Sequence, residues 1–277
     1  MLQYPQVFTF PQAAVALRKD PLGSVFDSHK RELQAYRRVM TGVTRMELAI
    51  SHPWDLPTDK AMALQARLAE KVIAETTFDP DAVRTVAGVD VSFPGDMARA
   101  AVVILRFPEL EPVGYVLAEV PVTFPYVPGL LALREGPSVL AALEKLTTWP
   151  DLLIFDAQGL AHPRRLGLAA HLGVILDWPS IGCAKSRLTG VHDEPGEAVG
   201  DWAPLYDKGE TIGAVVRSRA GVKPLYVSIG HRVDLPTAIE FVLRCTQGYR
   251  LPETTRYAHK VAGGAKLQIG HSQLGLL

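Results

Sequence analysis

Three β-rich runs joined by short turns constrain the fold of this chain more than any other feature of its sequence. The runs occupy residues 86–93, 101–107 and 113–120, and proline-containing turns at 94–96 and 108–112 join them. β-Branched and apolar runs between such turns are typical of strands. Connections this short favour antiparallel neighbours, because parallel strands need a crossover of a dozen or more residues. The sequence therefore predicts a three-stranded antiparallel meander.

The rest of the chain reads as helices and strands in alternation. One helix is expected from Asp59, and another from Pro137, because proline suits the first turn of a helix. Further helices are expected at 164–171, 236–248 and 252–261, strands at 152–155, 174–183, 211–217 and 224–229, and a polar loop at 192–209. A meander followed by βα units predicts an α/β fold in which helices flank a mixed sheet.

Composition excludes several classes of protein. The 277 residues are 48 % hydrophobic and 21 % charged, which fits one large globular domain and argues against a disordered or fibrous chain. No apolar run approaches the roughly 20 residues of a membrane span, no secretory signal begins the chain, and two cysteines are too few for a disulfide framework. A cytoplasmic protein without membrane contact is therefore expected. The 29 basic and 29 acidic side chains balance, which argues against a protein that coats nucleic acid through its net charge. A local basic face is compatible with this balance.

Three acidic residues fall where apolar chain meets polar chain: Asp90, Glu135 and Asp156. A carboxylate in an apolar strand is costly unless charged partners or a metal ion satisfy it. If the strands 86–93 and 152–155 are neighbours, the two aspartates repel each other unless a cation lies between them. Oxygen ligands without a Cys/His cluster favour Mg²⁺ or Mn²⁺ over zinc. The alternative, that each carboxylate only caps a turn, stays open at this point.

Polar and basic side chains follow the ends of three predicted strands. They are Gln158, Gly159, His162, Arg164 and Arg165 after the first, Lys185 and Arg187 after the second, and His231 and Arg232 after the third. Ligands of open α/β sheets bind at the carboxyl ends of strands, and a glycine-containing loop with arginines suits phosphate. Each basic residue alone is more often a solvated surface residue, but their recurrence favours a phosphate-binding edge.

Two prolines hold an aromatic residue in the segment TFPYVPGLLALREGP. Pro125 and Pro128 restrict the backbone on both sides of Tyr126. A rigid loop that presents tyrosine suits insertion between bases or stacking on one. The local sequence alone favours the simpler alternative of a tyrosine buried in a turn. Walker A, GxSxG, GxGxxG and HExxH motifs are absent, so ATPase, α/β-hydrolase, dinucleotide-binding and zincin classes lack support.

Six segments in a fixed order together resemble the endonuclease V family, the deoxyinosine 3′ endonucleases of DNA repair. They are VAGVDVSF, PYVPGLLALREGP, DAQGLAHPRRLGLAAHLG, GCAKSRL, SIGHRVDLPTA and GYRLPETTRYAH. The similarity runs from about His52 to His259, roughly three quarters of the chain. Each segment alone would be a weak signal, and the order and extent of all six make the match strong.

The resemblance implies a ribonuclease H-like fold and Mg²⁺-dependent hydrolysis, with Mn²⁺ able to substitute. The bond cut would be the second phosphodiester 3′ to deoxyinosine, leaving 3′-hydroxyl and 5′-phosphate ends. DNA containing deoxyinosine would be the partner, and a monomer is expected. Residues 46–263 would form the catalytic domain, 1–45 a poorly ordered or loosely attached extension, and 264–277 a tail. Three alternatives stay open: an inosine-specific ribonuclease, a binding protein that has lost catalysis, and a phosphatase for small phosphates.

The resemblance also assigns roles to positions of this sequence. Asp90 and Asp156 match metal-binding aspartates, and Glu135 matches the third acidic residue. Tyr126 matches a wedge that enters the duplex. His162, Lys185 and His231 match positions around the metal and the scissile phosphate. The remaining expected nucleic-acid contacts are Pro128, Gly129, Gln158, Gly159, Arg164, Arg165 and Arg232.

The sequence departs from the family pattern at two positions. Ala157 stands where the family usually has glycine, and alanine would be disfavoured if that residue needed a positive φ. Ile229 stands where the family commonly has proline. We expect Ala157 to tune its loop without abolishing metal binding, and Ile229 to loosen its loop slightly.

Overall fold

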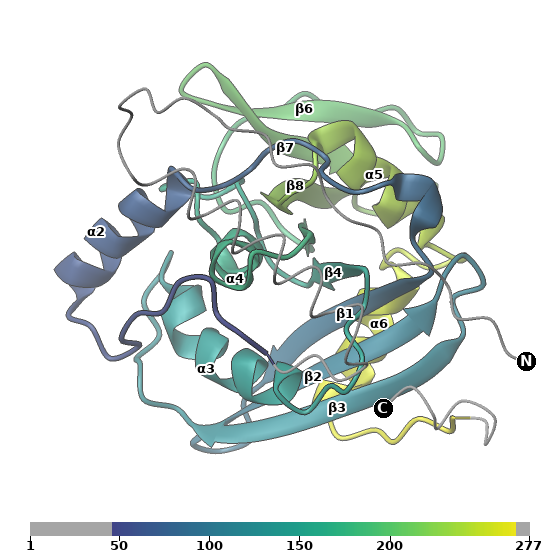
Figure 1. Cartoon of the computed structure of the whole chain (residues 1–277). Helices are drawn as coiled ribbons and strands as arrows, with labels where there is room; N and C mark the ends of the chain where they lie inside the picture. The colour runs from purple at the N-terminus through teal and green to yellow at the C-terminus, as the bar shows by residue number, and fades with distance from the viewer. Residues whose placement is uncertain (1–45, 270–277) are drawn as a thin grey trace, which may run out of the picture. The chain divides into compact units, whose positions relative to one another are not determined.

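An eight-stranded mixed sheet lies at the centre of the described chain (Figure 1). The computed structural model describes residues 46–269, so the expected extension over 1–45 and the tail from 270 lie outside the described residues. In spatial order the strands are β3 (Pro112–Pro121), β2 (Met97–Arg106), β1 (Thr85–Ser92), β4 (Leu152–Phe155), β5 (Ser180–Ala184), β8 (Leu225–His231), β7 (Glu210–Val216) and β6 (Trp202–Asp207). Among these strands, the neighbours that pair in parallel are β1 with β4 and β4 with β5, and the other neighbouring pairs are antiparallel.

The predicted meander is confirmed. β1 pairs antiparallel with β2 over its whole length, and β2 pairs antiparallel with β3. β4 then adds in parallel on the other side of β1, after a crossover through a helix. This arrangement places the carboxyl ends of β1, β4 and β5 at one edge of the sheet.

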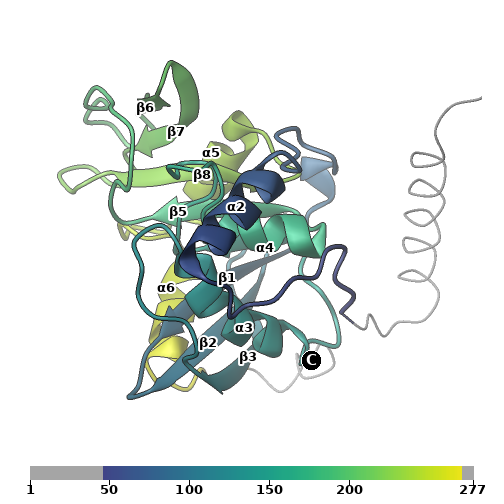
Figure 2. The ribbon, with the colours of Figure 1, turned by 90° about the vertical axis from the view of Figure 1, so that its left-hand side faces the viewer.

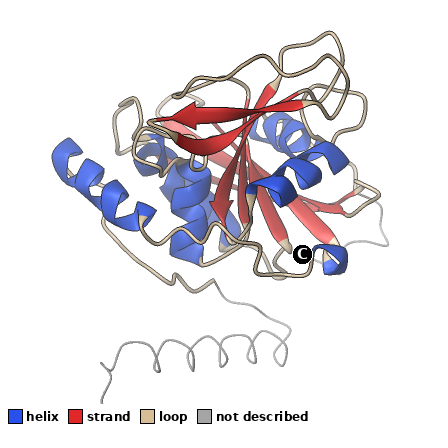
Figure 3. Ribbon diagram, turned by 90° about the horizontal axis from the view of Figure 1, so that it is seen from above, coloured by secondary structure: helices blue, strands red, loops and turns tan. Residues whose placement is uncertain are grey.

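Helices cover both faces of the sheet. They are α2 (Thr58–Ala69), α3 (Leu131–Leu143), α4 (Leu168–Leu176), α5 (Leu235–Arg244) and α6 (Glu253–Ala262), with a short 3₁₀ helix, η1, at Pro80–Ala82. Side chains of α2, α3 and α4 pack into one apolar core, and those of α5 and α6 into a second core. Figure 2 shows α3 and α4 on one side of the strands and α6 on the other, and Figure 3 shows the same layers from above. None of the described helices is long and apolar enough to cross a membrane.

The predicted start of α3 is wrong. The helix begins at Leu131, so Pro137 lies in its interior and Glu135 lies on a helix instead of at the end of a strand. A proline inside a helix removes the hydrogen bond that the carbonyl four residues earlier would accept. The hydroxyl of Ser138 donates to the Glu135 carbonyl at 2.7 Å within the same turn. The backbone ladder is therefore irregular beside Glu135.

Two further boundaries differ from the prediction. α4 spans Leu168–Leu176, although a helix was expected at 164–171 and extended chain at 174–183. This helix is buried and apolar all round, so it lacks the period that distinguishes a helix from a strand. Residues 202–207, expected in a loop, form the edge strand β6. Its sequence WAPLYD includes Pro204, and a proline within a short apolar run argues against a strand except at the edge of a sheet, where β6 lies.

Candidate metal and nucleic-acid site

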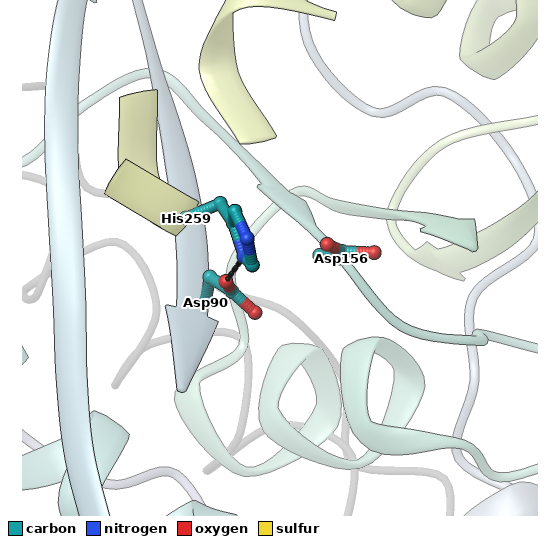
Figure 4. Close-up of side chains that lie close together, drawn as sticks. All are labelled: Asp90, Asp156 and His259. Atoms are coloured by element: carbon teal, nitrogen blue, oxygen red, sulfur yellow. Dashed lines mark hydrogen bonds and ion pairs between the residues drawn. The ribbon is translucent and has the colours of Figure 1, made fainter. Parts of the chain in front are cut away.

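Asp90 and Asp156 lie side by side where two parallel strands end. β1 and β4 pair with Val89 beside Phe155, and the Asp156 N–H donates to the Val89 carbonyl at 3.1 Å. From α6, Nδ1 of His259 lies 2.8 Å from Oδ2 of Asp90 (Figure 4). One possible ligand atom from each of Asp90, Asp156 and His259 lies within 4.8 Å of the others. These three side chains can therefore hold one metal ion.

The electrostatics of this cluster favour a cation. Burial, followed by the charge of Asp156, raises the pKa of Asp90 against the opposing effects of His259 and Lys185. Glu135 on α3 is 9 % exposed, and its burial together with the charges of Asp90 and Asp156 raises its pKa to about 8. The ammonium of Lys185, which follows β5, contacts the Asp156 carboxylate. Carboxylates crowded in this way lose their mutual repulsion when a divalent cation binds among them.

The loop before α3 is held at the carbonyl of Gly129. Three donors reach this oxygen: Nε2 of Gln65 at 3.0 Å, Nε2 of His162 at 3.0 Å and Nη2 of Arg164 at 2.7 Å. Gly129 has φ +78°, and a Cβ there would lie 2.8 Å from Nη2 of Arg164. Tyr126, at the other end of the loop, is 70 % exposed, so the expectation from local sequence of a buried tyrosine is wrong. The loop thus has a fixed base and an exposed aromatic tip.

His162 is neutral in this arrangement. Its Nδ1 accepts a hydrogen bond from the Arg164 N–H at 3.2 Å, so Nε2 carries the proton and donates to Gly129. Burial, with the charge of Arg164 as the next cause, lowers the pKa of His162 to about 4. Burial also lowers the pKa of Arg164, whose Nε donates to Oε1 of Gln65 at 2.6 Å. In the structure, His162 and Arg164 both support the loop.

A pocket of about 120 Å³ lies between this loop, α2 and the chain after β4. Apolar side chains form most of its wall, and Gln65, Gln158 and His162 bring polar atoms to it. Gln158 donates through Nε2 to the Ser186 carbonyl at 2.8 Å, while its buried Oε1 has no hydrogen-bond partner among the described residues. A mostly apolar pocket with a few polar groups is typical of a small-molecule or base site.

Gly159 and Ala157 have packing roles in the described structure. A Cβ on Gly159 would lie 2.0 Å from the Ile229 carbonyl, so the chain there passes against β8 too closely for any other residue. Ala157 does not have a positive φ, and its methyl group is buried in the core beside α4. Ile229 belongs to strand β8, where it pairs with Ile181, so it does not loosen a loop. Alanine and isoleucine are both compatible with these backbones.

His231 and Arg232 do not join the carboxylates. β8 is antiparallel to β5, and His231 pairs with Ser180 at the beginning of that strand. The end of β8 therefore lies at the edge of the sheet opposite to Asp90 and Asp156. There the Asp177 carboxylate accepts hydrogen bonds from Nε and Nη2 of Arg232 at 2.7 and 2.8 Å. The same carboxylate lies 3.2 Å from Nε2 of His231.

Arg165 is also engaged elsewhere, with the hairpin of β6 and β7. Its guanidinium pairs with Asp207 at 2.8 Å and with Glu210 at 3.0 Å. The described structure thus brings Asp90, Asp156, Glu135 and Lys185 together, and places Tyr126, Pro128, Gln158 and His162 around the neighbouring pocket. Arg165, His231 and Arg232 lie outside this arrangement.

Sequence reasoning missed His259 and Gln65 as candidate functional residues. The contact of His259 with Asp90 spans 169 positions and depends on how α6 packs across β1. The only signal was its place at the end of the GYRLPETTRYAH segment. Gln65 is 1 % exposed, and an uncharged polar residue on the buried face of an amphipathic helix is the signal that could have identified it.

Comparisons with known proteins agree with this geometry. The sequence profile of endonuclease V matches residues 66–260. The endonuclease V of Trichormus variabilis is 53 % identical over 219 residues, which cover 78 % of this chain and 99 % of the relative. The crystal structure of endonuclease V from Streptomyces avermitilis superposes with a TM-score of 0.73 at 44 % identity, covering 77 % of this chain and 95 % of that one.

A third relative was solved with nucleic acid. The endonuclease V of Ciona intestinalis, in complex with a 23mer DNA containing an inosine followed by a ribo-adenosine, superposes with a TM-score of 0.66 at 27 % identity, covering 75 % of this chain and 97 % of that one. These structural relatives confirm the expected ribonuclease H-like fold. On the profile match and the identity over most of its length, the chain belongs to the endonuclease V family.

Proposed function

We propose that this endonuclease is a DNA repair enzyme that hydrolyses the second phosphodiester bond 3′ to deoxyinosine and leaves 3′-hydroxyl and 5′-phosphate ends. The observation that carries the proposal is the meeting of Asp90, Asp156 and His259 at one edge of the sheet, in a chain of the endonuclease V family. The complex of the Ciona relative with inosine-containing DNA supports the choice of substrate.

We propose Mg²⁺ as the resident cation, with Mn²⁺ able to substitute. Asp90, Asp156 and His259 would hold it, and oxygen-rich donor sets suit both ions. When bound, the cation supplies activation of water and neutralisation of charge on the phosphate. The crowded carboxylates fit this ion, because a cation would favour the ionised forms that burial opposes in Asp90 and Glu135.

Lys185 and Glu135 are the proposed catalytic side chains beside the ligands. The Lys185 ammonium, already against Asp156, would stabilise the charge that develops on a phosphate at this edge. Glu135 would hold or transfer a proton. Without a cation its buried carboxyl has a pKa of about 8, so it is protonated at lower pH. Lys185 contacts Asp156, and the charges of both aspartates act on Glu135, so two different elements bring these side chains to the carboxylates.

The pocket beside Gly129 is the proposed site for the displaced hypoxanthine base. A base must leave the stack to be read, and extrusion costs least where pairing is already weak. Gln158 lines this pocket, and its buried Oε1 has no hydrogen-bond partner among the described residues, so a small rotation of the side chain would offer the base an acceptor. Tyr126, exposed at the tip of the loop, would fill the gap left in the duplex. We propose that His162 and Arg164 act by holding this loop, and that His231 and Arg232 stabilise the opposite edge.

The test is nicking of a duplex with a single deoxyinosine, with and without Mg²⁺, followed by mapping of the cut and of its ends. We expect a cut one nucleotide 3′ of the lesion, dependent on the metal, and none with the Asp90→Asn variant. A cut elsewhere, or no cut, would refute the proposed reaction. Matched strands with deoxyinosine and with inosine decide between a deoxyribonuclease and a ribonuclease, because only the second carries the 2′-hydroxyl.

We propose that the protein is cytoplasmic. Cys183 and Cys245 are both buried and unpaired, which supports the proposal of a reducing, cytoplasmic compartment. We also propose that the protein acts as a monomer, and that the catalytic domain spans 46–263.

A further inference from the structure

A second, larger cleft adjoins the carboxylate site and has no role in the function proposed so far. It measures about 690 Å³ and lies between the chain after β5, the turn from β7 to β8, and the loop before α6. Five basic side chains line it: Lys185, Arg187, Arg217, Lys223 and Arg250. Glu194 and Glu197 lie on its wall as well, so basic side chains predominate but are not alone.

Two of these arginines build the cleft. The guanidinium of Arg250 donates to the carbonyls of Lys185 at 2.6 Å, Lys223 at 2.8 Å and Pro224 at 2.9 Å. It therefore ties the chain after β5 to the turn before β8. Arg217 donates to the carbonyls of Gly196 and Val222 at 3.1 and 2.5 Å. Because these bonds fix its wall from several segments, the cleft is preformed.

Two other cations are available to a ligand. Arg187 and Lys223 are both exposed on the cleft, and within residues 46–269 no hydrogen bond or ion pair engages either side chain. Tyr226 adds a half-buried aromatic ring to the same wall. Unpaired cations beside an aromatic ring are typical of surfaces that bind a single nucleic-acid strand.

The position of the cleft indicates which strand it would receive. Lys185 lines the cleft and also contacts Asp156, so the cleft begins at the carboxylates. Leu188, at the end of the same short segment, lines the pocket proposed for the base. A strand with its base in the pocket and its scissile bond at the carboxylates would continue from Lys185 into the cleft.

We propose that this cleft binds the part of the cleaved strand that lies 3′ of the scissile phosphodiester, with Arg187 and Lys223 on its phosphates. This inference rests on the proposed function, because the direction of the strand follows from a cut on the 3′ side of the base.

The test measures binding of fluorescent single strands that contain one deoxyinosine, in EDTA so that no strand is cut. One pair of strands differs only in the length of the 3′ flank, on the order of ten nucleotides against one beyond the cut, and a second pair differs only in the 5′ flank. The proteins are wild type, the double variant Arg187→Glu with Lys223→Glu, and the control Arg106→Glu. Arg106 is also an exposed arginine, but it pairs with Thr85 at the opposite edge of the sheet.

We expect wild type to bind the long 3′ flank about tenfold more tightly than the short one, and the double variant to reduce this ratio below about twofold. The slope of log Kd against log salt should fall by about 1.4 for the long strand, about 0.7 for each lost phosphate contact. The 5′-flank ratio, the melting temperature and the control should stay unchanged. If the double variant loses affinity equally for strands with long and short 3′ flanks, or if its 5′-flank ratio changes, the proposal is overturned.

The nicking assay on the same proteins separates the two proposals. Correct nicking by wild type with an unaltered 3′-flank ratio in the double variant rejects the cleft and keeps the proposed function. The opposite result is also informative. If the double variant loses the 3′-flank ratio but wild type does not nick the deoxyinosine duplex, the proposed function is rejected and the cleft is kept as a strand-binding surface.

Discussion

Replacing Glu135 by glutamine measures the electrostatic cost of crowding carboxylates at the end of β1 and β4. In the metal-free protein, burial and the charges of Asp90 and Asp156 raise the pKa of this carboxyl from 4.5 to about 8. The unfolded chain therefore releases the proton near pH 4.5, while the folded chain retains it up to about pH 8. Because the folded state binds more protons in this window, the stability of wild type falls as the pH rises through it.

The size of the effect follows from the two pKa values. The difference between 4.5 and about 8 corresponds to at most about 5 kcal/mol, and relaxation and water reduce it. The buried glutamine amide adds a cost that does not depend on pH, so the diagnostic quantity is how the stability difference between variant and wild type changes with pH. We expect that difference to move by about 2–4 kcal/mol in favour of Glu135→Gln between pH 5 and pH 9.

Urea unfolding in EDTA at pH 5, 7 and 9 is the assay, followed by the fluorescence of tryptophans such as Trp54, which packs against Gly136. Glu144→Gln is the matched control, because Glu144 is exposed at the end of the same helix. Adding Mg²⁺ at pH 9 should narrow the difference between Glu135→Gln and wild type. A difference that stays constant within about 0.5 kcal/mol from pH 5 to pH 9 would refute the electrostatic reasoning.

Three more predictions concern the loop and its support. Tyr126→Ala should leave the melting temperature unchanged, because the side chain is 70 % exposed. In a binding titration it should weaken the affinity for a deoxyinosine duplex about tenfold, the effect of losing one stacking contact. Gly129→Ala should cost about 2 kcal/mol in urea unfolding, more than Gly95→Ala, since both have positive φ but only Gly129 has a neighbour in the way of a Cβ. As the pH falls from 6.5 to about 4, the free energy of unfolding of wild type should fall by at most about 3 kcal/mol, because the unfolded chain binds a proton at His162 before the folded chain does. His162→Gln should not show this fall. An equal change of the free energy of unfolding with pH in both proteins, measured by urea unfolding over this pH range, would contradict this last prediction.

The sequence was sufficient to predict features that depend on local pattern and short connections. The meander follows from turns too short for a parallel crossover. The meeting of Asp90 and Asp156 was predicted only on the condition that their strands are neighbours, and the structure meets that condition. Glu135 could be selected as an acidic residue in apolar surroundings. Its location on a helix was missed, because Pro137 is more typical of the first turn of a helix than of its interior.

The features that could not be predicted depend on strand direction and distant packing. His231 follows a strand just as Asp156 does, and nothing in the spacing shows that β8 runs opposite to β5. The pairing of His259 with Asp90 requires α6 to cross β1, which sequence pattern does not reveal. Arg165 is basic and follows a strand, yet its partners are provided by a hairpin that was only partly predicted.

The two buried cysteines make this protein convenient to label at a chosen place. Cys183 and Cys245 are the only cysteines of the chain, and burial raises the pKa of both thiols, that of Cys245 to about 12. Thiol reagents attack through the thiolate, so neither native cysteine should compete with an exposed one at neutral pH. A cysteine introduced at the exposed position of Arg106 would place a dye or a tether at the edge of the sheet away from the carboxylates. Single molecules could then be held on a surface with the nucleic-acid edge facing solution.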